Sequence, residues 1–362
     1  MRNIAQRWDH VKQILLPFME KCLGPMTEKE QRLVTILEIA QLDNFFGPDF
    51  RGPGRKKKNR TAIGCAFVAK MVFNLATTRD LIERLQSSPR LRRICGWSRV
   101  SEIPSESTFS RAFDEFAESE LPAKVHQAMI NKNLDGRLVG HISRDSSDVI
   151  AREKPVRKEQ KAAAKKPKRK RGRPKKGEQR PKEKTRLERQ PGMELEQMID
   201  DLPTACDIGT KKKMGKTYHW KGYKLHADFA DGEIPISCVL SSASLHDSQV
   251  AIPLATISNE RVLSLYDLMD SAYDAKAIHE HSLKLGHVPI IDSNPRKGEK
   301  VEMAPARKLR YNERSTAERG FSNLKDNYGG RNLRVRGHNK VYAHLMFGIV
   351  ALTAERLLGL LL

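Results

Sequence analysis

Apolar residues recur every three or four positions in the first third of the chain, which is the spacing of amphipathic helices. The pattern is clearest in residues 28–42 and 62–85. Farther along, Ser105 or Ser107 is placed to cap another helix through its hydroxyl group. Residues 1–130 are therefore expected to form a helical domain.

The period of the pattern changes near Leu138, where short runs typical of strands begin. Five strands are expected, at residues 138–145, 217–230, 234–242, 262–270 and 287–292, with a helix at 274–285 between the last two. Three strands joined in sequence and then a strand–helix–strand unit predict a mixed sheet with one antiparallel and one parallel half. The predicted fold class is α/β, with a ribonuclease-H-like mixed five-stranded sheet and helices, preceded by the all-α domain.

The last 22 residues, from Val341 to Leu362, are strongly apolar but include His344, Glu355 and Arg356. Charged side chains are costly inside a bilayer, so this segment is expected to be a buried core helix and not a membrane span.

A polar tract interrupts the strand pattern after the first strand. Residues 151–190 hold 19 Lys or Arg and 5 Glu, a surplus of +14, so the other 322 residues carry only +8 of the net +22. Such a segment cannot bury a core. The sequence predicts a basic disordered insertion at about 151–205 within the ribonuclease-H-like domain, which spans 131–362.

The sequence Lys-Arg-Gly-Arg-Pro-Lys-Lys at 170–176 lies inside this tract and resembles an AT-hook. An extended backbone with a Gly-Arg-Pro centre can place arginine in a narrow A·T-rich minor groove. Arg171, Arg173 and Lys175 are the candidate DNA-binding residues of the tract. A solubilising or purely electrostatic linker is the alternative interpretation.

The net charge of +22 and the basic helical domain favour a polyanionic partner, and double-stranded DNA is the expected one. An anionic membrane competes, but no basic amphipathic helix or anchor stands out. Five scattered cysteines form no C-x-x-C pair. They predict reduced thiols in a cytoplasmic protein, and association with the nucleoid would follow from DNA binding.

Two aspartates are expected to meet at one edge of the predicted sheet. Asp145 ends the first strand and Asp270 ends the fourth, and these strands are neighbours in the predicted order. Asp148 is the chief rival to Asp145, although Val149 beside it indicates that the chain has already turned away from the strand. A turn or capping role is the alternative for each carboxylate. The pair His246 and Asp247 is better explained as a helix cap than as a pair of ligands.

Tyr311, Arg314, Glu318 and Lys325 fall on one narrow stripe if the segment is helical, at about 100° per residue. A carboxylate flanked by two cations and a phenol can hold a divalent metal and grip the phosphates beside it. A solvated helix face is the simpler interpretation of such a stripe. A helix packed over the sheet edge would bring Glu318, which follows Asp270 by 48 residues, to both aspartates.

The spacing Tyr311-x2-Arg314-x3-Glu318-x6-Lys325 resembles the signature of bacterial insertion-sequence transposases with an Asp-Asp-Glu active site. The segments 141–147 and 269–274 are similar to the blocks around that family's first and second aspartates. Residues 61–116 look like the helical N-terminal domain of one branch. Together the resemblance covers most of the chain.

The resemblance implies that Asp145, Asp270 and Glu318 are catalytic and hold two Mg²⁺ ions, for which Mn²⁺ would substitute. It implies that Tyr311, Arg314 and Lys325 contact the phosphates of the transposon end, and that a homodimer assembles on DNA. Two alternatives remain: a nuclease of the same fold that cuts without joining strands, and a non-catalytic DNA-binding regulator.

Overall fold

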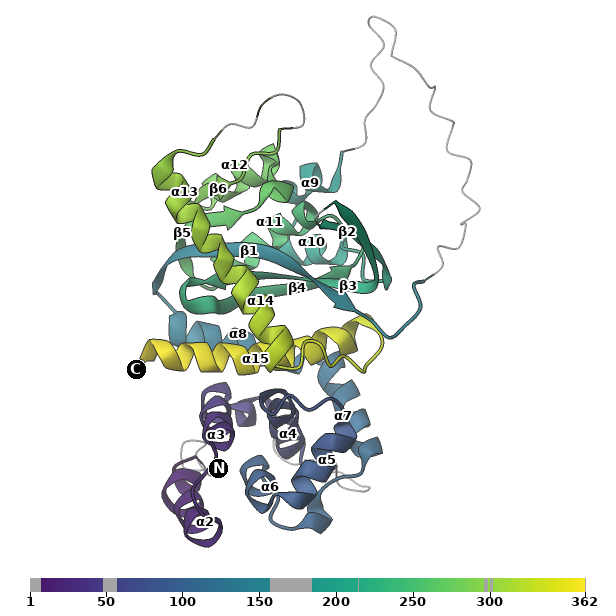
Figure 1. Cartoon of the computed structure of the whole chain (residues 1–362), viewed down its shortest axis with the longest axis vertical. Helices are drawn as coiled ribbons and strands as arrows, with labels where there is room; N and C mark the ends of the chain where they lie inside the picture. Colours follow the sequence, from purple (N-terminus) through teal and green to yellow (C-terminus); the bar gives the residue numbers. More distant parts are fainter. Residues whose placement is uncertain are drawn as a thin grey trace, which may run out of the picture.

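The computed structural model describes residues 8–47, 57–156, 184–213, 215–295, 299 and 302–361. A layer of helices at the N-terminus lies against a mixed α/β layer built on one sheet (Figure 1). Arg171, Arg173 and Lys175 lie outside the described residues, so the AT-hook interpretation stays a prediction.

The N-terminal layer is helical, as predicted. Its helices are α2 (Leu16–Leu23), α3 (Glu28–Ala40), α4 (Arg60–Val72), α5 (Thr78–Ser87), α6 (Pro89–Cys95), α7 (Glu106–Glu118) and α8 (Leu121–Leu134), with shorter turns η1 (Val11–Leu15), η2 (Leu42–Phe45) and η3 (Val100–Glu102). Local signals begin several of them: Thr27 and Glu30 form a capping box at α3, and Thr77 and Asp80 form another at α5.

The strands are β1 (Leu138–Ile150), β2 (Asp207–Lys213), β3 (Lys216–Ala230), β4 (Ile234–Ser242), β5 (Leu263–Met269) and β6 (Val288–Ile291). β1 pairs antiparallel with β3 and parallel with β5, β3 pairs antiparallel with β4, and β5 pairs parallel with β6. The predicted antiparallel and parallel halves are therefore confirmed. The predicted number of strands is wrong, because β2 pairs with the first half of β3 and makes six.

The first strand is longer than predicted. β1 continues through Ser146, Ser147 and Asp148 to Ile150, so Asp145 lies within the strand and not at its end. The interpretation that Asp148 has turned away from the strand is also wrong, because Asp148 pairs with Lys224 of β3. Polar residues continue the strand because it is paired on both sides up to Arg144 and with β3 beyond it.

The helices of the second layer are α9 (Arg186–Arg189), α10 (Leu195–Asp200), α11 (Ala251–Asn259), α12 (Lys276–Lys284), α13 (Pro305–Tyr311), α14 (Ser315–Asn327) and α15 (His338–Leu361), with turns η4 (Gln190–Gly192), η5 (Asp231–Glu233), η6 (Asp247–Val250), η7 (Ser271–Tyr273) and η8 (Asn312–Arg314). α9, η4 and α10 fall in the insertion that we expected to be disordered up to about residue 205. They are folded because Arg186 pairs with Asp201 at 2.7 Å and Gln190 is buried.

α14 and α11 cover opposite faces of the sheet. Phe321 of α14 packs against Phe229 of β3, with ring centroids 5.1 Å apart. Asp228, the preceding residue of β3, instead accepts a hydrogen bond from Ser258 of α11. Successive side chains of a strand alternate between faces, so the two helices sandwich the strand.

α15 lies between the two layers and is the predicted core helix (Figure 1). It is long and apolar enough to cross a membrane, but 72% of its most apolar window is buried within the protein. Phe347 at its centre is fully buried and lies 5.5 Å from the ring of Phe67 in α4. On its other side, Tyr342 donates a hydrogen bond to the carbonyl of Cys238 in β4. One core therefore joins the helical layer to the sheet.

Gly320 allows α14 to approach the sheet. A Cβ atom at this position would collide with the ring of Phe229, although glycine is normally unfavourable inside a helix. Close contact at Gly320 holds the beginning of α14, with Glu318 and the preceding Arg314 of η8, over β1.

We predict that Gly320→Ala lowers the free energy of unfolding by about 1–3 kcal/mol, because steric overlap outweighs the gain of about 1 kcal/mol in helix propensity. Gly359→Ala in α15 is the matched control, because a Cβ atom there meets nothing within 4 Å and should be neutral or stabilising. Urea denaturation of both variants checks this. Equal effects of the two substitutions would contradict the proposed close packing.

Candidate active site

Asp145 and Asp270 lie side by side on neighbouring parallel strands. Arg144 of β1 pairs with Met269, the last residue of β5. Asp145 follows Arg144 and Asp270 follows Met269, so the two aspartates lie at the same edge of the sheet. Asp270 begins η7 and accepts a hydrogen bond from the amide of Ala272 at 2.9 Å. Asp145 accepts one from the amide of Ser146 at 2.7 Å. The prediction that these two carboxylates are neighbours is confirmed.

The environment of these carboxylates opposes their ionisation. Burial, together with the nearby charge of Asp270, raises the pKa of Asp145 to about 6. Burial also raises the pKa of Asp270, and the charge of Asp247 adds to the effect. Buried carboxylates with raised pKa values are typical of functional sites, because a bound cation or proton must compensate their charge.

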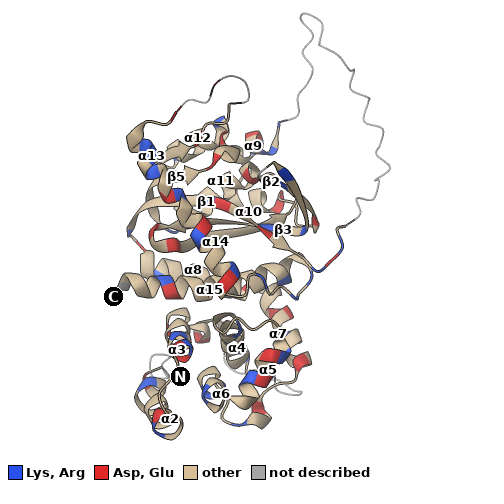
Figure 2. Ribbon diagram, viewed as in Figure 1, with Lys and Arg blue, Asp and Glu red and all other residues tan. Residues whose placement is uncertain are grey.

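Arg314 connects Asp145 to Glu318. Its guanidinium group lies 3.6 Å from the carboxylate of Asp145 and 2.7 Å from that of Glu318. The Glu318 side chain is 58% exposed, whereas that of Asp145 is 22% exposed. Acidic and basic segments lie next to one another along α14 (Figure 2).

The three predicted carboxylates do not form a ready metal site. Among the described residues, no three His, Cys, Asp or Glu side chains are grouped so that they could hold a metal ion. The expectation that Asp145, Asp270 and Glu318 converge directly is therefore not met. The physical reason is the ion pairing of Glu318 and Asp145 with Arg314, which places a guanidinium group between the two acids.

The predicted stripe of four residues spans three elements and not one regular helix. Tyr311 ends α13, Arg314 ends the 3₁₀ turn η8, and Glu318 and Lys325 belong to α14. The guanidinium group of Arg314 lies 5.8 Å from the ring centre of Tyr311. Lys325 points elsewhere, to Asp148 at 3.1 Å. Asp148 is thus bound to a lysine, which separates it from the pair formed by Asp145 and Asp270.

Asp247 lies near Asp145 and Asp270, whereas the sequence predicted a capping role for it and no place beside them. It begins η6, and its carboxylate lies 2.9 Å from the ammonium group of Lys224. The hydroxyl group of Ser146 also donates to it, and its charge contributes to the raised pKa values of Asp145 and Asp270. The chain becomes helical at this point, as expected, but no capping hydrogen bond is made there by the side chain of His246. The position of Asp247 within five residues of the end of β4 was the available signal.

The fold and the site describe a mixed α/β domain that gathers partly buried carboxylates at one edge of its sheet. Residues 199–354 match the family model described as "Transposase DDE domain", and residues 20–115 match the one described as "Transposase domain (DUF772)". These matches support an insertion-sequence transposase, a class of enzyme that acts on DNA. No curated protein is significantly similar to the chain.

The matched segments divide the candidate site. Asp247, Asp270 and Glu318 fall within the DDE match, whereas Asp145 and the basic tract lie between the two matches. The matches describe domains and do not assign a role to any single residue.

The raised pKa of Asp145 makes folding stability depend on pH. Its folded pKa, about 6, exceeds the ordinary value of 3.8, so the folded protein binds more protons between these two values. Stability therefore falls as the pH rises through this window. We predict that Asp145→Asn, which mimics the protonated acid, raises the free energy of unfolding at pH 7.5 by about 1–3 kcal/mol. The gain should vanish at pH 4.

Denaturation in urea with EDTA at the two pH values checks this prediction. Asp326→Asn is the control, because the pKa of that exposed carboxyl group is lowered by hydrogen bonds to Arg331 and Ser322. It should not stabilise the protein at pH 7.5. A loss of stability in Asp145→Asn at pH 7.5 would show that the Asp145 carboxylate is not electrostatically unfavourable.

Proposed function

We propose that this protein is a DNA transposase that binds the terminal inverted repeats of its own element. In this proposal it cleaves the ends by metal-dependent phosphodiester hydrolysis and joins the resulting 3′-hydroxyl groups to target DNA. The observation that carries the proposal is the adjacent pair Asp145 and Asp270, with Glu318 linked to it through Arg314. The two transposase matches support the same conclusion.

The order of the strands supports a ribonuclease-H-like catalytic domain. Without β2, the sheet runs β4-β3-β1-β5-β6, with an antiparallel half that leads into a parallel half. β2 is then an addition that extends the hairpin arm of β3. The proposed domains are residues 1–130, which contact DNA, and residues 131–362, which carry the chemistry.

The donor atoms suit a hard divalent cation. Carboxylate oxygens are the ligands that Mg²⁺ prefers, and the raised pKa values of Asp145 and Asp270 show that this pair lacks sufficient positive charge. Asp145, Asp270 and Glu318 would hold two Mg²⁺ ions, or Mn²⁺ in their place. When bound, such ions activate an attacking oxygen and stabilise the leaving oxygen in phosphodiester chemistry.

The remaining residues of the stripe bind and orient the DNA phosphate. Arg314 has a planar guanidinium group suited to two phosphate oxygens, and a phosphate bound there would release Glu318 from its ion pair. Burial raises the pKa of Tyr311, so its hydroxyl group stays protonated and can donate a hydrogen bond. Lys325 adds a positive charge farther along α14. None of these roles requires a covalent nucleophile, so water and then a 3′-hydroxyl group attack the phosphorus.

Two alternative functions are distinguished by simple assays. A nuclease of the same fold would cut transposon ends but would not join a pre-cut 3′ end to target DNA. A non-catalytic regulator would bind DNA and cut nothing. The tyrosine and arginine near Glu318 favour a transposase, since they can contact a phosphate beside the carboxylates.

We predict that Asp145→Ala, Asp270→Ala and Glu318→Gln each abolish cleavage of a duplex that carries the element's inverted repeat. The expected loss is at least 10³-fold, because metal-assisted activation contributes several kcal/mol to the rate. DNA binding in EDTA should be unchanged. Glu313→Gln, one turn from Glu318, is the matched control and should cut normally. Residual cutting above background in Glu318→Gln would remove Glu318 from the proposed site.

We predict that deletion of residues 160–183 weakens DNA binding and flattens its dependence on salt, because it removes 12 Lys or Arg and only 2 Glu. The deletion ends before Arg186, which is anchored to Asp201. Fluorescence anisotropy from 50 to 300 mM salt measures the slope, and the thermal unfolding temperature should be unchanged. Replacing Arg171, Arg173 and Lys175 together with Gln should remove the preference for A·T-rich duplexes and flatten the salt dependence less than the deletion does, because three cations are lost instead of 12. An unchanged slope in the deletion would show that the tract does not contact DNA.

A further inference from the structure

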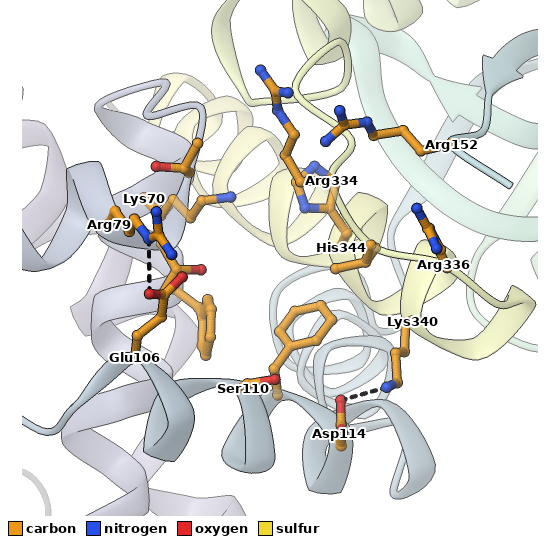
Figure 3. A pocket seen from close by; sticks show the side chains of 15 residues that line it. Lys70, Arg79, Glu106, Ser110, Asp114, Arg152, Arg334, Arg336, Lys340 and His344 are labelled. Atoms are coloured by element: carbon orange, nitrogen blue, oxygen red, sulfur yellow. Dashed lines mark hydrogen bonds and ion pairs between the residues drawn. The ribbon is translucent and has the colours of Figure 1, made fainter.

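A cavity of about 610 Å³ lies between the helical layer and the segment that leads into α15 (Figure 3). Its walls come from α4, the beginning of α5, α7, the chain after β1, and the first turns of α15. Asp145, Asp270 and Glu318 are not among the residues that line it. The cavity therefore has no part in the chemistry proposed above.

Cations dominate the walls of this cavity. Six basic residues line it, against two acidic ones: Lys70, Arg79, Arg152, Arg334, Arg336 and Lys340 face Glu106 and Asp114. Both acids are already neutralised, because Glu106 lies 2.8 Å from Arg79 and Asp114 lies 2.8 Å from Lys340 (Figure 3). Four positive charges remain, a surplus that favours an anionic ligand.

Lys70 is the decisive residue of the cavity. It is 5% exposed, and no hydrogen bond or ion pair joins its ammonium group to the described residues. Burial lowers the pKa of Lys70 to about 8, while the charge of Asp80 opposes this shift and the charge of Arg334 adds to it. Burying an unpaired ammonium group is costly, so its retention needs a reason outside packing.

The surroundings of the cavity favour a phosphate group of duplex DNA as the ligand. The hydroxyl groups of Thr77 and Thr78 line the cavity at the start of α5, where a helix end attracts anions, while the amide of Thr77 donates to Asp80 in the capping box. Arg152 lies only five residues before residue 157, where the most basic part of the tract begins. A polyanion bound by the tract would thus pass close to the cavity, whereas a small free anion would gain nothing from it.

We propose that this cavity binds a phosphate of the DNA backbone, with Lys70 as the central contact and Arg334 and Arg336 at its mouth. The inference rests on the proposed function, since it assumes that DNA is the partner. The proposed phosphate contact lies at the junction of the helical layer and the α/β layer, and not on the exposed face of the helical domain.

The test is binding of a 30-base-pair duplex to the full chain in EDTA, in the Asp270→Asn background so that no cutting occurs. Lys70→Met should weaken binding about equally for every duplex sequence, by roughly tenfold. It should also reduce the slope of log K against log salt by about one. The unfolding temperature should be equal or higher, because methionine removes an unpaired buried charge. A purely structural role for Lys70 would lower the unfolding temperature and leave the slope unchanged.

Arg334→Gln with Arg336→Gln provides a second variant at exposed positions, where folding is not at risk. It should also flatten the salt dependence. Lys132→Met, on the exposed side of α8, is the control and should not change the slope. Normal duplex binding in both cavity variants would overturn the proposal. Inorganic phosphate provides a further test. If it stabilises the parent protein but not Lys70→Met, and both proteins bind the duplex equally well, the ligand of the cavity is a small anion and the proposal is overturned.

The two proposals fail separately. If Asp270→Asn cuts DNA normally, the proposed catalytic site is wrong, and the cavity is still tested by the binding measurements. If Asp270→Asn is inactive but Lys70→Met binds DNA like its parent, only the cavity proposal is wrong.

Discussion

The buried ion pair between Arg144 and Asp228 is the contact on which the site depends. The guanidinium group donates two hydrogen bonds to the carboxylate, at 2.8 and 2.7 Å, and Ser258 donates a third at 2.6 Å. Both side chains are almost completely buried, so loss of either partner would leave a charge without compensation, at a cost of about 3–5 kcal/mol. Because the pair joins β1 to β3, it fixes the strand that carries Asp145. The opposite face of the same strand then presents Asp145 to α14.

The site itself is electrostatically unfavourable, in contrast to the pair beneath it. Asp145 and Asp270 are held together by strand register, and their pKa values are raised because the cost of burial exceeds the compensation that nearby positive charge provides. Arg314 offsets part of this charge from one side. A stable interaction in the strand therefore supports an unstable arrangement beside it. This combination is expected where a ligand supplies the missing charge.

The sequence predicted the parts of the fold that follow from apolar periodicity. The five strands and the buried helix α15 were found because their apolar residues repeat regularly. β2 was missed, since Asp207–Lys213 is largely polar and is a strand only through its pairing with β3. The predicted end of β1 at Asp145 was too early for a related reason. The polar residues 146–148 are typical of a turn, and only their pairing with β3 makes them part of the strand. The ion pair of Arg144 with Asp228 spans 84 residues and has no local signature. Asp247 joins the carboxylates only because η6 packs beside η7, a contact that no spacing predicts.

α14 runs from the carboxylate site to the end of α4, the helix that carries Lys70. Its first turn carries Glu318, and its last residues contact the end of α4, where Asn74 donates a hydrogen bond to the carbonyl of Asp326 at 2.8 Å. Thirteen helical residues span about 20 Å, which equals the rise of about six base pairs of DNA. A duplex that contacted both the carboxylate site and the region of Lys70 would therefore lie alongside α14. Because Gly320 and Phe229 lock this helix to the sheet, the distance between a phosphate held at Lys70 and the reacting phosphate would be fixed by packing and not by a linker.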